Sequence, residues 1–214
     1  MLLALDTSTR FVSVAAYDPE QDPGVLAAAT SDRPMQHGEQ LAPLVDQVLA
    51  EAGAIRQDVT AVVVGVGPGP YTGLRVGVVT ARVLGLALGI PVYGVCSLDV
   101  LAARAVDEGV SEPFVATLDA RRKELFWAAY DETGHRLDGP HVDRPSDLPR
   151  DVLVVGDGPV RYPDAFGRTA GPETPDAATM AGVVAEERAE LVDPEPIYLR
   201  RPDATVPGPP KKVS

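Results

Sequence analysis

A strand, an aspartate, a polar turn and a second strand occur twice in this chain, once in each half. In the first copy an apolar run ends at Asp6, and the alternating strand that follows closes on Ala-Ala-Tyr-Asp at residues 15–18. In the second copy the run ends at Asp119, and the same tetrapeptide closes the strand at residues 128–131, at the same spacing. A repeated supersecondary unit at matched spacing favours a duplication over a chance match. The sequence therefore predicts an α/β chain of two lobes, each built around one hairpin.

The first hairpin tip carries residues that can bind magnesium and phosphate. A hairpin of this kind in each half resembles the duplicated, ribonuclease H-like fold of the actin, hexokinase and Hsp70 superfamily (ASKHA), in which the two tips face the phosphates of a nucleotide. Asp6 can hold a water on Mg²⁺, and Thr7 and Ser8 can donate hydrogen bonds to phosphate oxygens. This tip indicates either a nucleotide site or the vestige of one.

The second hairpin tip departs from that pattern. Asp119 is followed by Ala120 and then by three cations, Arg121, Arg122 and Lys123, with no hydroxyl among them. These charges can meet phosphate or an acidic partner, although an exposed tip of this composition is more often only solvated. The sequence leaves the role of this basic tip open.

A glycine-rich stretch at residues 62–91 predicts strand, loop, helix and strand in succession. Residues 61–66 form an apolar run of strand length, GPGPYTG is rich in turn residues, residues 74–88 are apolar on all sides, and residues 91–95 form a further strand. A phosphate-binding P-loop needs Lys and then Ser or Thr after its last glycine, whereas Leu74 and Arg75 follow Gly73. A dinucleotide fingerprint is also incomplete, so we do not expect a phosphate cradle here.

Small residues recur at every fourth position of the helix in this stretch: Gly73, Gly77, Ala81, Gly85 and Gly89. Because glycine costs about 1 kcal/mol relative to alanine in a helix interior, such a row indicates that another element lies close against it. Two interpretations are open: close packing on the sheet of the same lobe, or docking on another protein. Arg75 and Arg82 interrupt the segment, so we do not expect it to span a membrane.

Composition narrows the class of protein. The chain has 214 residues, 45% of them hydrophobic and 23% charged, which is typical of a globular protein. Its formal net charge of -12 should repel nucleic acid phosphates. The single cysteine, Cys96, excludes an intrachain disulfide, and the N-terminus shows no signal peptide, so we expect a cytoplasmic protein. No two of the three histidines have the spacing of a paired metal ligand.

The remaining segments complete the predicted architecture. We expect a third strand near residues 25–32, a helix from 36 to 52, a helix from 98 to 106, loops over 132–151, a strand over 152–156 and a helix from Pro175, capped by Thr174, to 191. The predicted domains are an N-terminal lobe at 1–106, a smaller C-terminal lobe at 107–204 and a flexible tail at 205–214.

Several motifs together resemble the bacterial TsaB family, also called YeaZ. They are LALDTST with SVA, the helix motif HxxxLxPLV, the run VGVGPGPYTGLRVGVVTARVLGLALGIPVYGVCSLD, the hairpin ATLDARRKELFWAAY, and PxPxYLRRPDA near the C-terminus. The GPGxYTGLR run is highly specific, whereas residues 132–193 match only loosely.

The resemblance implies a role in installing N6-threonylcarbamoyl on the adenosine beside the anticodon of tRNAs that read ANN codons. It implies a catalytically inactive paralogue and obligate partner of TsaD, the metal-bearing transferase, with the ATPase TsaE joining the complex. It further implies no catalytic residue, cofactor or metal of its own, and contact with tRNA only through the complex. An alternative from the residues themselves is a nucleotide-binding ATPase or phosphotransferase that uses Asp6; a peptidase lacks an assembled nucleophile and base.

The family's dimer contact uses two N-lobe helices, which correspond here to residues 37–52 and 73–88. The resemblance therefore implies a partner interface at Leu41, Leu44, Val45, Val48, Gly73, Gly77, Ala81 and Gly85. On this view the row of small residues is the smooth face of a docking helix. The sequence leaves open whether the chain alone forms a homodimer through the same helices.

Overall fold

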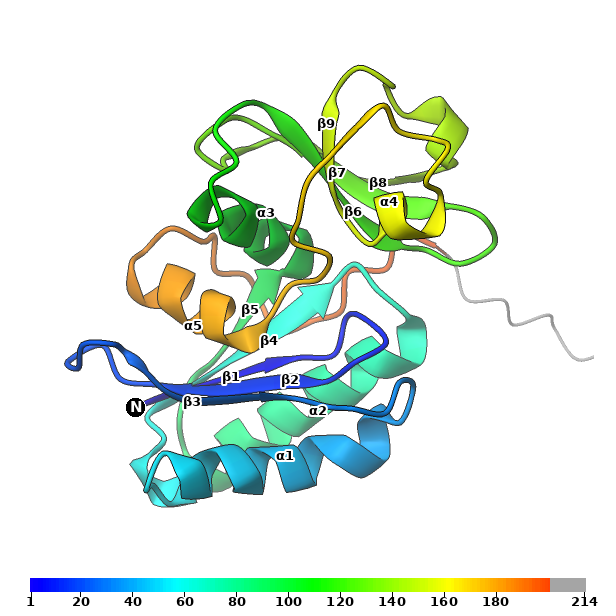
Figure 1. The fold of residues 1–214 in the computed structure, drawn as a ribbon. Helices are drawn as coiled ribbons and strands as arrows, with labels where there is room; N and C mark the ends of the chain where they lie inside the picture. The colour runs from blue at the N-terminus through cyan, green and yellow to red at the C-terminus, as the bar shows by residue number, and fades with distance from the viewer. Residues whose placement is uncertain (201–214) are drawn as a thin grey trace, which may run out of the picture.

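The computed structural model describes residues 1–200 and folds them into two lobes, each centred on a five-stranded sheet (Figure 1). The predicted tail at 205–214, like residues 201–204, lies outside the described residues. The first sheet has the order β3-β2-β1-β4-β5 and the second β10-β9-β6-β7-β8. The strands of the first sheet are β1 (Leu2–Asp6), β2 (Ser13–Tyr17), β3 (Val25–Thr30), β4 (Ala61–Gly67) and β5 (Val92–Cys96). Those of the second sheet are β6 (Phe114–Asp119), β7 (Leu125–Tyr130), β8 (Arg136–Asp143), β9 (Leu153–Gly156) and β10 (Arg168–Thr169).

The two sheets have the same topology, which confirms the predicted duplicated α/β fold. In each sheet the first strand pairs antiparallel with the second and parallel with the fourth, and the second pairs antiparallel with the third. Asp6 ends β1 and Asp119 ends β6, while Tyr17 and Tyr130 end the strands that pair with them. The repeated sequence pattern therefore marks equivalent positions in space.

Helices cover the first sheet on both faces. α1 (His37–Glu51) and α2 (Tyr71–Leu88) pack on the face that carries Leu3 and Leu5, and α5 (Ala177–Ala185) packs on the opposite face with Ala4 and Val63. This division follows from the alternation of side chains along a strand. Because both faces are buried, the strands read as continuous apolar runs.

The second lobe has fewer helices over an equivalent sheet. α3 (Ser97–Asp107) covers the face with Phe114, and the opposite face packs against Leu148, Phe166 and their neighbours rather than against long helices. The connections that correspond to α1 and α2 hold only the 3₁₀ turn η2 (Pro145–Asp147) and the single turn α4 (Gly158–Arg161). A further 3₁₀ turn, η1 (Arg56–Asp58), precedes β4.

The packing crosses the boundary predicted at residue 106. α3 joins the core of the second sheet although it begins at Ser97, before that boundary, and α5 returns from the second half to the first sheet (Figure 1). The segment after α5 also runs back to the first lobe, where Ile197 donates its backbone N–H to the Val66 carbonyl and Val192 bridges to Gly94. The halves are thus bound together by exchanged elements.

Two local expectations are wrong. Residues 136–143, expected as loop, form β8. β8 is an edge strand, which tolerates Gly139 and Pro140 and therefore lacks the apolar pattern of a buried strand. The helix expected from Pro175 to residue 191 covers only Ala177–Ala185 and is capped by Asp176, whose Oδ1 accepts a hydrogen bond from the Thr179 N–H at 2.8 Å. An Asx cap suits the first turn because it satisfies a free backbone donor.

Candidate functional site

Asp6 lies at the end of β1 with its carboxylate enclosed by serines. Its Oδ1 accepts hydrogen bonds from the Ser8 N–H at 2.9 Å and the Ser8 hydroxyl at 2.7 Å, and its Oδ2 accepts one from the Ser97 hydroxyl at 2.8 Å. Only 2% of Asp6 is exposed, and this burial raises the pKa of its carboxyl above the usual value. Both oxygens are therefore engaged within the lobe and none is offered to a bound ion.

Ser97 is a member of this cluster that the sequence did not reveal. Its hydroxyl donates a hydrogen bond to Asp6 Oδ2 and accepts one from the Gly67 N–H at 3.3 Å. The two residues are far apart in sequence, and only the parallel strands β1, β4 and β5 bring them together. The neighbouring Cys96 is free and buried, and burial raises the pKa of its thiol to about 12, so the thiol is protonated at neutral pH.

Thr7 connects the first hairpin tip to α2. Its hydroxyl donates to the Gly73 carbonyl at 2.8 Å, and its side chain is fully buried. A Cβ added to Gly77 would overlap Thr7 Oγ1, and one added to Gly85 would overlap Val92. Glycine is needed at these positions because α2 lies directly on the tip and the sheet.

The row of small residues on α2 therefore faces inward. Gly73, Gly77, Ala81 and Gly85 are all buried in the first lobe, which supports the first of the two interpretations, close packing on the sheet. The assignment of this row to a partner contact is corrected, because its glycines already lie against Thr7, His37 and Val92 of the same lobe.

The predicted interface residues of α1 lie in the same interior. Leu41, Leu44, Val45 and Val48 form part of the core between α1 and the first sheet, each with no more than 9% of its surface exposed. These residues, which the family resemblance implied as a partner contact, form the ordinary inner stripe of an amphipathic helix. A contact through these helices would have to use other residues.

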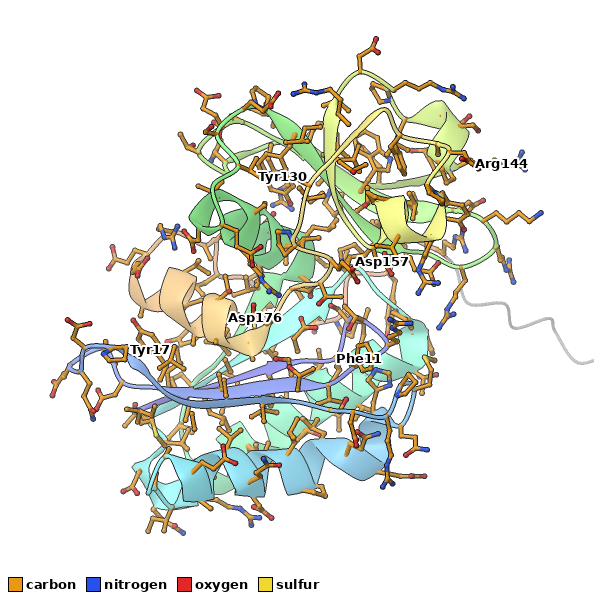
Figure 2. The ribbon with its side chains drawn as sticks, viewed as in Figure 1. Phe11, Tyr17, Tyr130, Arg144, Asp157 and Asp176 are labelled. Carbon is orange, nitrogen blue, oxygen red and sulfur yellow. The ribbon has the colours of Figure 1, made fainter. Side chains whose placement is uncertain are left out.

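The second hairpin tip is held by ion pairs. Asp119 Oδ1 accepts from the Arg121 N–H at 2.9 Å, and its Oδ2 lies 3.5 Å from Arg121 Nε and 3.4 Å from Arg161 Nη1. Asp157 pairs with Arg161 at 2.8 Å, and burial raises the pKa of the Asp157 carboxyl. Figure 2 shows Asp157 at the junction of the two lobes.

The space between the two tips is nearly closed. It measures about 10 Å³, whereas small-molecule pockets are on the order of 300–1,000 Å³. Its walls come from both lobes: Ser8, Thr9, Arg10, Pro70, Leu118, Asp119, Arg121, Asp157 and Arg161. Gly69 of the glycine-rich loop lies so close to Ser8 that an added Cβ would overlap its backbone. The arrangement has room for about one water and none for a nucleotide.

The outer face of α2 carries an exposed apolar stripe that the sequence analysis missed. We call Val79, Val83 and Leu86 the α2 stripe; their exposed fractions are 58%, 58% and 87%. Hollows of about 520 and 470 Å³ border it, lined also by Arg75, Arg82 and Tyr71. The sequence did contain an indication of this stripe, because residues 74–88 are apolar on all sides. A helix that buries only one face must expose the apolar side chains of the opposite face.

Tyr198 extends this surface from the C-terminal segment. Its ring lies 4.9 Å from that of Tyr71, and its hydroxyl accepts from Arg75 Nε at 3.0 Å. The Arg75 guanidinium in turn lies 3.9 Å from the centre of the Tyr71 ring. These contacts fix both aromatic rings beside the stripe.

Within residues 1–200, no three or more His, Cys, Asp or Glu side chains are grouped so as to hold a metal ion. α2 has the length and apolar composition of a membrane-crossing helix, but its small-residue face is packed on the first sheet.

Comparison with known proteins places the chain in a family. The model of the family TsaD, tRNA N6-adenosine threonylcarbamoyltransferase, matches residues 24–152. An uncharacterized protein of Mycobacterium tuberculosis is 41% identical over 206 residues, which cover 95% of this chain and 93% of that protein. The tRNA threonylcarbamoyladenosine biosynthesis protein TsaB of Escherichia coli is 31% identical over 222 residues, covering 93% and 94% of the two chains.

A solved structure agrees with these relatives. YeaZ from Pseudomonas aeruginosa superimposes with a TM-score of 0.75 at 29% identity, covering 92% of this chain and 99% of its own. The likeness therefore extends over both lobes, including residues 132–193, where the sequence motifs match only loosely. The chain belongs to the TsaB (YeaZ) family.

Proposed function

We propose that this chain is a non-catalytic scaffold subunit for the formation of N6-threonylcarbamoyladenosine (t6A) in tRNA. In this proposal it acts in the cytoplasm, binds a TsaD-like transferase through the α2 stripe, and is joined by a TsaE-like ATPase. The modified base is the adenosine beside the anticodon of tRNAs that read ANN codons. The relatives named as t6A biosynthesis proteins, from Escherichia coli and Bacillus subtilis among others, support this process.

The α2 stripe is the observation that carries the proposal. It places three large apolar side chains at helical spacing on the surface, on the side of α2 opposite the buried glycines. Removing such side chains from water stabilises a complex by about 25 cal/mol per Å² before the costs of association. Arg75 and Arg82 flank the stripe and suit a partner with carboxylates around an apolar centre.

A TsaD-like transferase is the occupant that these features favour. The TsaD family model matches residues 24–152, which include α1 and α2, so such a transferase shares this part of the fold. Two chains of one fold can pair through equivalent surfaces about an approximate twofold axis, as homodimers do about a true one. In the absence of the transferase, we propose that the same stripe pairs two copies of this chain.

The geometry of the first tip opposes the alternative, an ATPase that uses Asp6. The carboxylate is buried, its oxygens accept from Ser8 and Ser97, and the space between the tips is about 10 Å³. Calorimetric titration with Mg-ATP separates the two functions. The scaffold proposal expects no heat of binding that depends on Asp6; micromolar binding that is lost in Asp6→Ala would favour the enzyme.

The stripe itself is tested with a double variant, Val83→Glu with Leu86→Glu. Burying two carboxylates in an apolar contact should weaken association with the transferase by about 100-fold. The matched control is Leu137→Glu with Val160→Glu, which changes two exposed apolar residues of the second lobe, 63% and 61% exposed.

Sedimentation velocity of each variant mixed with the transferase provides the measurement. The control should associate as the natural chain does, and circular dichroism should show both variants folded. A stripe variant that is folded and still binds with unchanged affinity would place the interface elsewhere.

A further inference from the structure

We propose that the basic tip, with the aromatic pocket beside it, binds a single-stranded segment of RNA. The basic tip is Arg121, Arg122 and Lys123, and the pocket has a volume of about 370 Å³. Cations of the tip would contact phosphates, and the pocket would receive an unpaired base. The identity of the RNA as tRNA rests on the proposed function, whereas the binding itself does not.

Positive charge gathers at this end of the molecule. The walls of the pocket and of the slot between the tips include two carboxylates, Asp119 and Asp157, and five arginines: Arg10, Arg121, Arg122, Arg161 and Arg200. A third carboxylate, Glu124, pairs with Arg200 beside them. Arg144 is at the same end of the second sheet, because Asp143 pairs with Leu125 in the strand that leaves the tip (Figure 2).

The local balance matters more to an RNA phosphate than the net charge of the chain. The chain carries -12 overall, which would repel a polyanion if it were evenly spread. At physiological ionic strength the Debye length is about 8 Å, so carboxylates elsewhere on the surface are largely screened at the tip. A basic end on an acidic protein also fixes the orientation in which a polyanion approaches.

The backbone of the tip holds its cations in a defined arrangement. Arg121, Arg122 and Lys123 have φ angles of 62°, 54° and 62°, in the left-handed region that glycine normally occupies. The Asp119 carboxylate fastens the turn through the Arg121 N–H, and all three side chains of the tip are exposed.

The pocket adds the chemistry that recognises a base. Tyr71 and Tyr198, 38% and 42% exposed, form part of its wall, and the remaining lining residues include Phe126, Ile197, Leu199 and Arg200. Proteins that bind single strands combine aromatic surfaces for base stacking with cations that follow the backbone. A volume of about 370 Å³ falls in the range of sites for small ligands, on the order of 300–1,000 Å³.

Arg200 joins the tip and the pocket into one surface. It donates from Nη1 to the Ala120 carbonyl at 2.9 Å and pairs with Glu124. The C-terminal segment that carries Tyr198 is thereby attached to the second hairpin. An acidic protein surface would use the cations but has no need of an aromatic pocket, so the combination favours RNA.

The test compares two triple variants that each remove three positive charges. Arg121→Ala, Arg122→Ala and Lys123→Ala empty the basic tip. The control replaces three exposed arginines, Arg56, Arg150 and Arg168, with alanine; they lie at the ends of the sheets opposite the tips. For example, Arg168 pairs with Leu153 of β9, and Leu153 pairs with Phe114 at the start of β6, whereas the tip follows the end of β6. Binding of a fluorescent tRNA is measured by anisotropy at several salt concentrations, with the chain alone and with its complex with the transferase.

The tip variant should bind tRNA at least about tenfold more weakly, and the slope of log K against log salt should fall by about 2, at ~0.7 per lost phosphate contact. The control variant should match the natural chain in both quantities. Unchanged affinity and slope in a tip variant that still binds the transferase would overturn the proposal.

Two further arms distinguish other ligands. A single-stranded oligonucleotide should compete with tRNA, whereas AMP alone should compete at least about 100-fold less well, because it offers one phosphate. AMP that binds as tightly as tRNA would make this a nucleotide site. Loss of transferase binding in the tip variant, with tRNA affinity of the isolated chain unchanged, would assign the tip to a protein contact. Failure of the stripe test alone would leave the tRNA result on the isolated chain intact.

Discussion

The two lobes share one sheet topology and differ in what covers it. Between the third and fourth strands the first lobe has α1, 15 residues long, and the second has a 3₁₀ turn; between the fourth and fifth strands the first has α2, 18 residues long, and the second has four residues of helix. The hairpins diverge as well, since Asp6 is enclosed by serines and Asp119 by arginines. Duplication has preserved the strands, and the surfaces available to partners come from the connections.

The difference also separates two kinds of surface. The first lobe presents the apolar α2 stripe, and the second presents the basic tip. The first would suit a protein partner and the second an anionic one.

The largest expected effect is on the contact between α2 and the first tip. Gly77→Leu would drive a side chain into Thr7, so we expect the free energy of unfolding to fall by about 3 kcal/mol. Urea denaturation followed by circular dichroism measures the loss. A variant with unchanged stability would mean that α2 does not lie on the tip, and the row of small residues would again be available to a partner.

The second prediction concerns the buried carboxyl of the first tip. The pKa of Asp6 is raised by burial, so its protonated form is the better tolerated one in the folded state. Its contribution to stability is present below pH 3.8, the unfolded value, and is lost as the pH rises through the raised folded value. Asp6→Asn should remove this loss, so the stability of the natural chain relative to the variant should decrease as the pH rises.

Asp18, at the other end of the first hairpin, provides a control of opposite sign. Hydrogen bonds from the Glu20 N–H and Gln21 lower the pKa of its carboxyl, so its contribution is present above pH 3.8 and is lost as the pH falls through the lowered folded value. Relative to Asp18→Asn, the natural chain should gain stability as the pH rises. Thermal unfolding from pH 3 to 7 compares all three chains, and parallel curves for the two variants would contradict the account of Asp6.

The smallest expected effect is at Gly182, a helical glycine of α5 with open space around its Cβ position. Gly182→Ala should stabilise the chain by about 0.5–1 kcal/mol, because alanine is the better helix former and nothing obstructs its methyl group. Set beside Gly77→Leu, it separates a glycine required by packing from one that is not. Destabilisation on urea denaturation would show that α5 is packed more closely than described.

Much of the fold was predictable from local patterns. The duplication was visible because both hairpins keep Asp and Ala-Ala-Tyr-Asp at fixed positions, and β4, α2 and β5 followed from the glycine-rich stretch with boundaries within a few residues. β8 was not predictable, since an edge strand with exposed residues and a Gly-Pro pair lacks a strand's apolar pattern.

The candidate site was less accessible to sequence reasoning. The sequence identified α1 and α2 but not which face of each looks outward, because a glycine row is compatible with a sheet or with a partner helix. The role of Ser97 depends on parallel pairing between strands that are distant in the chain. The α2 stripe follows from the burial of the small-residue row, because that packing leaves Val79, Val83 and Leu86 facing outward.

Reconstitution of tRNA threonylcarbamoylation tests the central claim most directly. The transferase, the ATPase and tRNA are combined without this chain, with the natural chain, with Val83→Glu and Leu86→Glu, and with Leu137→Glu and Val160→Glu. We predict that t6A forms with the natural chain and with the control variant. With the stripe variant, the amount of t6A should fall to the level of the reaction that contains no copy of this chain. Equal product in the absence of the chain, or with the folded stripe variant, would contradict the account.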